Sequence, residues 1–161
     1  MSKLLPNLYL DSIFHIDFDD LKSRGITTLL FDLDNTIAGY DVPVADERVT
    51  EYFNNLKDMG FSVCLVSNNR DARVLKYADS INLSYIAFAK KPFKSGILKA
   101  CKIFDVKPIN CAIIGDQVFT DVYGGNRLGM LTILVKPLNP PKAFFIKLKR
   151  RIEQRVLRNW K

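Results

Sequence analysis

The sequence has few of the residues that build soft-metal sites or disulfides. It contains one histidine, His15, and three cysteines, Cys64, Cys101 and Cys111, that are well separated and show no C-x-x-C spacing. We therefore do not expect a zinc site made of histidine and cysteine. Cys64 and Cys111 lie inside apolar runs, where a free thiol behaves as a small hydrophobic side chain. We interpret the cysteines as structural thiols.

Long hydrophobic runs are also absent. No apolar stretch approaches the roughly 18 residues that a membrane-spanning helix needs, although 48% of the 161 residues are hydrophobic. The first ten residues, MSKLLPNLYL, hold one lysine and an apolar patch broken by proline, with no small-residue cleavage site after them. We therefore expect no signal peptide, and a compact domain that stays in the cytoplasm.

Excess positive charge is missing from most of the chain. The net charge is +7, but residues 142–161 alone hold eight Lys or Arg and one Glu. The other residues hold 16 basic and 16 acidic side chains, which cancel. We therefore divide the chain into a body, residues 1–139, and a basic tail, residues 140–161.

Short apolar runs alternate with helical patterns along the body. The predicted strands are Thr27–Asp32, Ser62–Val66, Ser84–Phe88, Cys111–Ile114 and Leu131–Val135, and the predicted helices are Ala45–Met59, Asp71–Asp79, Ser95–Phe104 and Asp121–Leu128. Continuous apolar strands separated by helices are typical of a parallel sheet that is buried on both faces. The predicted fold class is α/β: a doubly wound, mainly parallel Rossmann-like sheet with helices on both faces. The intervals are too short for a large cap domain.

Polar residues follow the predicted strands. They are DLDNT (32–36), SNN (67–69), KKP (90–92) and GDQVFTD (115–121). Ligands of such sheets bind outside the carboxyl ends of the strands, so these segments are expected to meet. Clustered carboxylates need either a cation that neutralises them or one carboxyl group that stays protonated, and oxygen ligands without His or Cys favour Mg²⁺. A lysine and backbone amides beside such an ion would hold an anion, for which phosphate is the natural candidate.

The order of these segments resembles a known family. D-x-D-x-T, then Ser, then Lys-Pro, then G-D-x-x-x-x-D is similar to the four motifs of the haloacid dehalogenase (HAD) superfamily. The fuller pattern DLDNT…SNN…AKKP…GDQ-x-x-TD-x-x-GGN resembles the class III, capless YqeG-type phosphatases, which are related to mitochondrial phosphatidylglycerophosphate phosphatases. One departure is Gln117, since many superfamily members carry a second acid there; the YqeG-type branch also has G-D-Q.

The resemblance implies roles for three acidic residues. Asp32 would be the nucleophile that forms an aspartyl-phosphate. Asp34 would protonate the leaving oxygen and later activate water as a base. Mg²⁺ would be bound by Asp32, Asp116 and the backbone carbonyl of Asp34.

The resemblance also implies residues that handle the phosphate. Thr36, Ser67 and Asn68 would bind it, and Lys91 would stabilise its charge. We prefer Lys91 to the preceding lysine because the family's lysine directly precedes the proline. Asp121 would orient Lys91 or a metal-bound water. Simpler roles stay open: a turn or cap for Thr36 and Ser67, a turn for Asn68, and an N-cap for Asp121.

The basic tail, PPKAFFIKLKRRIEQRVLRNWK, predicts an amphipathic helix that starts after the two prolines. Its apolar stripe comprises Phe145, Leu148, Ile152, Val156 and Trp160. A basic amphipathic helix of this kind favours attachment to an anionic membrane surface. Docking onto the body, a solubilising tail, and contact with nucleic acid stay open as alternatives.

Together these features predict an Mg²⁺-dependent phosphomonoester phosphatase. The resemblance implies phosphatidylglycerophosphate as the substrate and a place on the inner face of the membrane, in phospholipid biosynthesis. Two alternatives remain: a phosphatase for a soluble nucleotide or sugar phosphate, and a protein that binds RNA or a GTPase and turns over phosphate incidentally.

Overall fold

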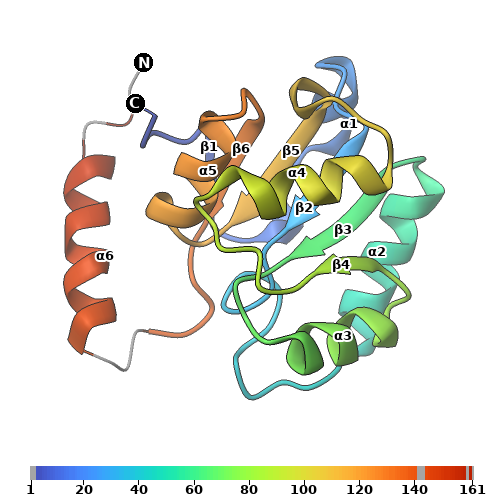
Figure 1. Cartoon of the computed structure of the whole chain (residues 1–161), viewed down its shortest axis with the longest axis horizontal. Helices are drawn as coiled ribbons and strands as arrows, with labels where there is room; N and C mark the ends of the chain where they lie inside the picture. The colour runs from blue at the N-terminus through green and yellow to red at the C-terminus, as the bar shows by residue number, and fades with distance from the viewer. Residues whose placement is uncertain (1–2, 141–143, 159, 161) are drawn as a thin grey trace.

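A computed structural model describes residues 3–140, 144–158 and 160. In it, six parallel strands form one sheet in the order β1-β6-β5-β2-β3-β4, with helices on both faces (Figure 1). The strands are β1 Leu8–Leu10, β2 Thr28–Phe31, β3 Ser62–Val66, β4 Ser84–Ile86, β5 Cys111–Gly115 and β6 Leu131–Val135. The helices are α1 Phe18–Ser23, α2 Glu47–Asp58, α3 Asp71–Ser80, α4 Lys94–Ile103, α5 Tyr123–Asn126 and α6 Phe144–Leu157. The predicted parallel α/β fold is confirmed.

The sheet is buried on both faces, which explains why its strands are continuously apolar. On β2, Leu29 and Phe31 point toward the side that carries α1, α2 and α3, where they join Phe53 in one core cluster. Leu30 points the opposite way and packs in the cluster that contains Ile97 of α4. Fully burying an aliphatic or aromatic side chain of this size contributes roughly 1.5–3 kcal/mol.

Several elements differ from the sequence-based expectation. β1 and α1 were not predicted, because three and six residues are too few to show a period. β2 and β4 end before the predicted Asp32 and Phe88. The predicted helix Asp121–Leu128 is a π-helical turn, η3 (Val118–Val122), followed by the four-residue α5.

The sheet reverses its direction of growth between β2 and β5. From β2 the chain adds β3 and β4 on one side, and it later adds β5 and β6 on the other. The backbone N–H of Asp32 donates to the carbonyl of Ile114 at 2.8 Å, so the two strand ends lie side by side. Such a switch point is where open parallel sheets bind ligands, because the connecting loops diverge there.

The helix predicted in the tail is present as α6, which lies along the side of the body at the left of Figure 1. Leu157 packs on a small cluster formed by Val118, Val122 and Leu134. Leu148 and Ile152, from the predicted apolar stripe, are instead 46% and 44% exposed. The stripe residue Phe145 has its side chain outside the described part, as do residues 141–143, 159 and 161. Among the described residues, no helix is long and apolar enough to cross a bilayer.

Candidate active site

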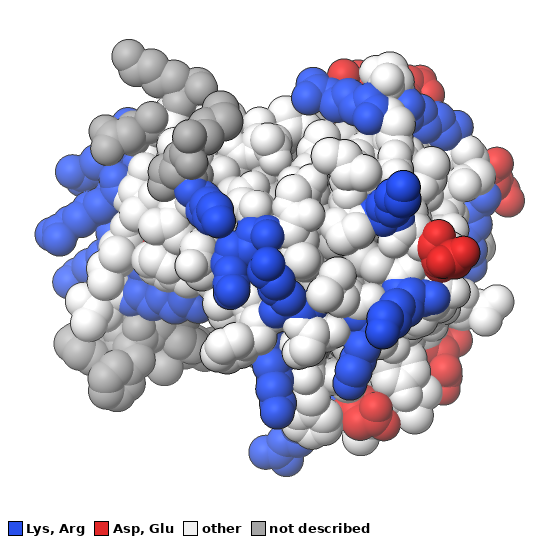
Figure 2. Space-filling model, turned by 45° about the horizontal axis from the view of Figure 1, so that its top comes forward, with Lys and Arg blue, Asp and Glu red and all other residues white. Residues whose placement is uncertain are grey.

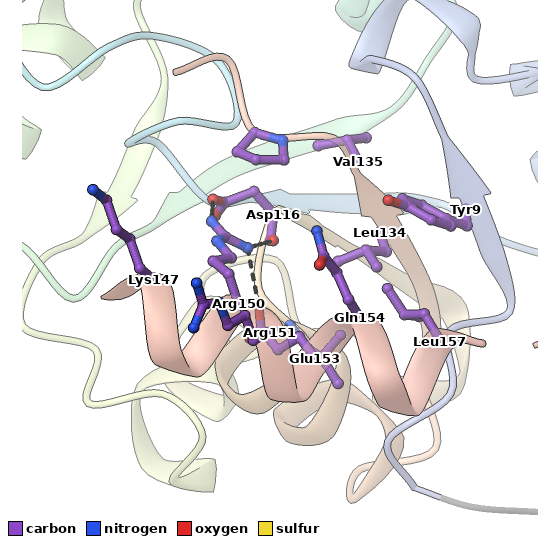
Figure 3. A pocket seen from close by; sticks show the side chains of 12 residues that line it. Tyr9, Asp116, Leu134, Val135, Lys147, Arg150, Arg151, Glu153, Gln154 and Leu157 are labelled. Atoms are coloured by element: carbon purple, nitrogen blue, oxygen red, sulfur yellow. Dashed lines mark hydrogen bonds and ion pairs between the residues drawn. The ribbon is translucent and has the colours of Figure 1, made fainter. Parts of the chain in front are cut away.

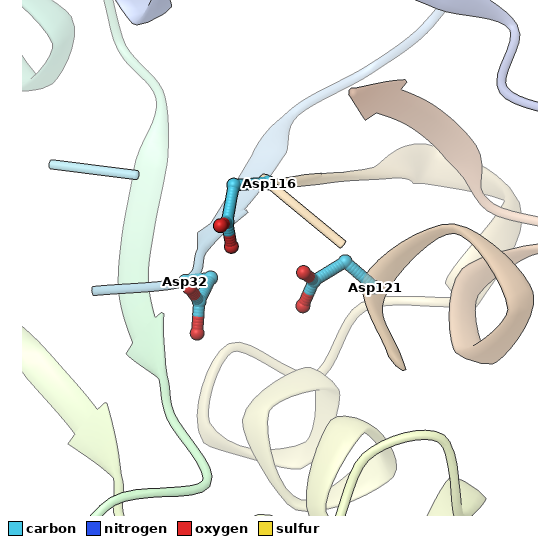
Figure 4. Close-up of side chains that lie close together, drawn as sticks. All are labelled: Asp32, Asp116 and Asp121. Atoms are coloured by element: carbon cyan, nitrogen blue, oxygen red, sulfur yellow. The ribbon is translucent and has the colours of Figure 1, made fainter. Parts of the chain in front are cut away.

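Three buried carboxylates converge at the switch point. Asp32 follows β2, Asp116 follows β5, and Asp121 lies in the π-helical turn η3, and their side chains face a common space (Figure 4). One carboxylate oxygen from each lies within 4.8 Å of the others. Gly115 makes this possible, because a Cβ there would collide with the side chain of Asp121.

Lys91 bridges two of these acids. Its Nζ lies 2.8 Å from Oδ1 of Asp32 and 2.7 Å from Oδ1 of Asp121, and its side chain is only 2% exposed. Asn68 fixes the backbone of this lysine: its Oδ1 accepts from the Lys91 N–H at 2.7 Å, and its Nδ2 donates to the Lys91 carbonyl at 3.0 Å. The neighbouring Lys90 is exposed. The structure therefore separates the two adjacent lysines by environment.

The two predicted hydroxyl residues are both buried near this cluster. Thr36 Oγ1 donates to Oδ2 of Asp32 at 3.1 Å, so the carboxylate of Asp32 is held by Thr36 on one oxygen and Lys91 on the other. Ser67, directly after β3, accepts the backbone N–H of Asn69 on its Oγ at 3.1 Å. This hydrogen bond shapes the turn that carries Asn68, whose side chain amide bonds the backbone of Lys91.

The side chain of Asp34 makes its contacts outside the three-acid cluster. Its Oδ2 accepts from Nδ2 of Asn69 at 2.8 Å, and its Oδ1 pairs with Nη2 of Arg73 at 3.2 Å. Arg73 also donates to the carbonyl of Gly39 at 3.0 Å, which ties α3 to the loop after β2. Sequence reasoning missed Arg73, because nothing distinguishes it from other polar residues of an amphipathic helix.

Burial dominates the electrostatics of the cluster. Desolvation raises the pKa of Asp32 to about 7, with Lys91 opposing the shift and the charges of Asp121 and Asp116 adding to it. Burial likewise raises the pKa of Asp116 to about 6, against the lowering effect of Arg150. For Lys91, burial disfavours the charged form, but Asp121 and Asp32 outweigh it and raise the pKa. The lysine therefore stays charged between its two carboxylates.

The donor set fits a hard divalent cation. All three converging groups offer carboxylate oxygens, the ligands that Mg²⁺ prefers. Oδ1 of Asp116 is buried without a hydrogen-bond partner among the described residues, a state that a cation would relieve. The Asp34 side chain does not belong to this cluster, whereas Asp121, expected outside the ligand set, does.

Helix α6 also reaches the cluster. The guanidinium of Arg150 hydrogen-bonds both the carboxylate and the backbone carbonyl of Asp116. Around this contact lies a pocket of about 290 Å³ between α6 and the ends of β5 and β6 (Figure 3). Neither Arg150 nor its partner Glu153 was predicted to lie at the site. A signal existed for Glu153, which is the single acidic residue of the basic tail.

Comparison with known proteins identifies the family. A family model for hydrolases, described as haloacid dehalogenase-like hydrolase, matches residues 4–129. The chain belongs to the haloacid dehalogenase-like hydrolases. This hydrolase is 38% identical to the probable phosphatase YqeG of Bacillus subtilis over 153 residues, covering 95% of this chain and 89% of YqeG. That similarity supports a phosphatase of this family.

Two further similarities are more distant. The hydrolase is 27% identical to phosphatidylglycerophosphate phosphatase 1 of Arabidopsis thaliana over 173 residues, covering 98% of this chain but only 48% of that protein's length. A structure of 3-deoxy-D-manno-octulosonate 8-phosphate phosphatase from Moraxella catarrhalis, with magnesium, phosphate and KDO bound, superposes with a TM-score of 0.54. The superposition covers 88% of this chain and 92% of that one at 14% identity, so it shows a shared fold.

Proposed function

We propose that this hydrolase is an Mg²⁺-dependent phosphomonoester phosphatase that acts through an aspartyl-phosphate on Asp32. The observation that carries the proposal is Lys91, which bridges Asp32 and Asp121 inside the buried three-acid cluster. A cluster of this kind lacks a stability rationale, because each uncompensated buried charge costs free energy. Phosphoryl transfer would require each of the three acids and Lys91.

The residues that would hold the cation are Asp32 and Asp116, with Asp121 beside them and the backbone carbonyl of Asp34 as a further oxygen ligand. When bound, the cation would neutralise charge between the attacking carboxylate and the phosphate. The repulsion it offsets is several kcal/mol for two unit charges about 4 Å apart at an effective dielectric near 20.

The protein's own residues would perform the transfer. One carboxylate oxygen of Asp32, oriented by Thr36, attacks phosphorus while the ester P–O bond breaks. Lys91, with Ser67 and the backbone amides after it, stabilises the charge on the transferring oxygens. Asn68 would keep Lys91 in position during this step, because both the oxygen and the nitrogen of its side chain amide are hydrogen-bonded to the Lys91 backbone.

Asp34 would carry the proton in both half-reactions. In its acid form it protonates the leaving oxygen; its carboxylate then takes a proton from the water that attacks the aspartyl-phosphate, and phosphate is released. Because Asn69 and Arg73 hold both of its oxygens, Asp34 must exchange at least one of these contacts for the substrate.

We propose a membrane lipid phosphate, phosphatidylglycerophosphate, as the substrate. Three features support this: the name of the Arabidopsis relative, the lack of a cap domain over the site among the described residues, and the outer face of α6. On that face Leu148 and Ile152 lie exposed among Arg151 and Arg155, and Figure 2 shows basic side chains over the α6 side of the molecule, at the left. Exposed apolar and basic side chains on one helix face favour an anionic lipid surface.

The test is phosphate release, with Mg²⁺, from phosphatidylglycerophosphate in mixed micelles, beside a panel of soluble nucleotide and sugar phosphates. Asp32→Asn, which keeps the size of the side chain, provides the blank, and circular dichroism checks its fold. We expect the lipid to be preferred by at least roughly a hundredfold in kcat/KM, since this corresponds to a few kcal/mol of transition-state binding.

Each other outcome would remove a defined part of the proposal. Preference for a soluble ester would keep the chemistry and discard the lipid. Appreciable turnover by a folded Asp32→Asn variant would exclude Asp32 as the nucleophile. No turnover of any phosphomonoester would favour a binding protein for RNA or a GTPase.

A further inference from the structure

We propose that docking of α6 and binding of a divalent cation oppose each other at Asp116, so that the cation loosens α6 and α6 restricts access of the cation. The inference rests on the proposed function in one respect, that Asp116 is a ligand of the cation. It adds a regulatory role for a helix outside residues 4–129, the part that matches the family model.

The contact between α6 and the site is direct. Arg150 donates from Nη2 to Oδ2 of Asp116 and from Nη1 to its backbone carbonyl. The Asp116 side chain is completely buried in this arrangement, and that of Arg150 is 16% exposed. The guanidinium of Arg150 thus already contacts the Asp116 carboxylate, which the divalent cation would also bind.

A second buried residue anchors the helix to the same loop. Glu153, 3% exposed, accepts the backbone N–H groups of Val118 and Phe119 on Oε1 at 3.1 and 3.4 Å. Its Oε2 pairs with Nη1 of Arg150 at 3.1 Å, which holds the guanidinium over Asp116. Lys149 adds a bond to Oε1 of Gln117 at 2.5 Å. The residues that follow Asp116 therefore form the docking site of α6.

The charges predict the sign of the coupling. Asp32, Asp116 and Asp121 with Lys91 carry two net negative charges when all are ionised, which one divalent cation neutralises. Docking of α6 brings Arg150 together with its partner Glu153, so the net charge of the group does not change, but the guanidinium is the group that contacts the Asp116 carboxylate and shares it with the incoming ion. Like charges at such short range in a buried site repel strongly, because little solvent screens them. Contact of the Arg150 guanidinium with Asp116 therefore weakens binding of the divalent cation there, and the bound divalent cation weakens the contact of Arg150.

The coupling must act in both directions. If the divalent cation weakens the docking of α6 by some factor, docking weakens the affinity for the cation by the same factor. Removing the Arg150 charge should then raise cation affinity, and adding the cation should release α6. These two consequences are measured separately.

Calorimetric titration with Mg²⁺ tests the first consequence in the whole chain of 161 residues. We expect Arg150→Gln to bind Mg²⁺ roughly tenfold more tightly than the wild type, within the usual range of such couplings. Arg151→Gln is the matched control, because Arg151 is the adjacent residue with the same charge, is exposed and has no hydrogen bond to Asp116. We expect it to change the affinity less than about twofold.

Trp160 tests the second consequence, because it is the single tryptophan and lies just beyond the end of α6. Its Nε1 donates to the carbonyl of Pro6 at 2.7 Å, and its ring lies 6.0 Å from that of Tyr9, edge to face. We expect Mg²⁺ to shift its emission to longer wavelength as the indole becomes solvated. Asp116→Asn should show no shift.

Three results would overturn the inference. Two concern affinity for Mg²⁺: Arg150→Gln binds Mg²⁺ as tightly as Arg151→Gln does, or binds it more weakly. The third is calorimetric binding of Mg²⁺ by the wild type without a change in Trp160 emission. None of these readouts requires turnover. An enzyme that releases phosphate but shows no coupling removes only this inference. A coupled protein without phosphatase activity removes only the proposed reaction, and absence of any Mg²⁺ binding removes both.

Discussion

At the scale of single residues, the three-acid cluster holds buried carboxyl groups whose ionisation is unfavourable in the folded protein. Burial raises the pKa of Asp32 to about 7 and that of Asp116 to about 6, both well above the 3.8 of an ordinary aspartate. Ionising these two carboxyl groups in the folded state therefore costs stability, as we expect of groups that serve the proposed reaction. Lys91 and Arg150 offset part of the cost, each through contacts to a buried carboxylate.

The raised values predict how stability depends on pH in the absence of divalent cations. A raised pKa means that the folded state binds more protons than the unfolded state between about pH 4 and 7, so stability falls as the pH rises through this range. We expect a loss of up to roughly 1 kcal/mol per pH unit for each titrating group. Urea unfolding in EDTA at pH 5, 6 and 7 measures it.

The control for this measurement is Asp32→Asn, which removes one of the two titrations. It should give a shallower dependence on pH than the wild type, and Mg²⁺ should flatten the wild-type curve as well. A metal-free wild type that becomes more stable from pH 5 to pH 7 would contradict the assignment of the raised values to burial.

At the scale of elements, α6 presents different chemistry on its two faces. The inner face docks through Arg150 and Glu153 on the loop after β5, which is an unusual use of charged residues. The outer face exposes Leu148 and Ile152. A helix that only stabilised the body would be expected to bury its apolar side chains, so this arrangement favours an external partner for the outer face.

The outer face can be tested without disturbing docking. We expect the double variant Leu148→Ser and Ile152→Ser to bind vesicles of phosphatidylcholine and phosphatidylglycerol roughly thirtyfold more weakly, because burying each side chain at the interface contributes about 1 kcal/mol or more. Turnover of a soluble aryl phosphate should be unchanged. Vesicle sedimentation measures binding.

Ile109→Ser is the matched control for that variant. Ile109 is 65% exposed, but it lies in the turn that precedes β5, at the amino edge of the sheet and away from the site. We expect this substitution to leave vesicle binding unchanged. Equal losses from the double variant and the control would mean that general surface apolarity, and not α6, governs binding.

At the scale of the whole molecule, charge and site are arranged asymmetrically. The net charge of +7 comes entirely from residues 142–161, while the rest of the chain is balanced. The helix formed from this segment lies next to the carboxyl edge of the sheet, because it docks on the loop that carries Asp116. An anionic surface that attracts the tail would therefore bring the active site close to that surface, and a helix released by Mg²⁺ would still be tethered to the same edge of the sheet through β6.

This arrangement predicts a selective effect of salt. Raising NaCl from about 0.05 to 0.5 M shortens the Debye length from roughly 14 to 4 Å, which screens the tail from an anionic surface. At saturating Mg²⁺ we expect turnover of lipid phosphate in anionic vesicles to fall roughly tenfold or more, since about 1 kcal/mol per basic residue is at stake. Turnover of a soluble aryl phosphate, measured in parallel, should change far less. Equal losses on both substrates would place the salt effect in the catalytic cluster.

Local composition alone predicted five of the six strands and the polar residues that follow them. Continuous apolar strands such as Ser62–Val66 have both faces buried, so local composition is sufficient to find them. Asp32, Asp116 and the pair Lys90–Lys91 were singled out as polar residues that follow apolar runs, and the resemblance to the family then selected Lys91. The short elements β1 and α1 carried no such signal.

Which side chains meet at the site depends on the folded chain and could not be predicted from composition. Arg73 and Arg150 lie 39 and 34 residues from their partners Asp34 and Asp116, and no periodicity encodes contacts at that separation. The same holds for α6: its hydrophobic pattern predicted a helix, yet packing against the loop after β5 turned Glu153 inward and left Leu148 exposed. The physical reason is that a buried acid can be compensated only by specific donors. The positions of those donors, here two backbone amides and a guanidinium, exist only once the chain has folded.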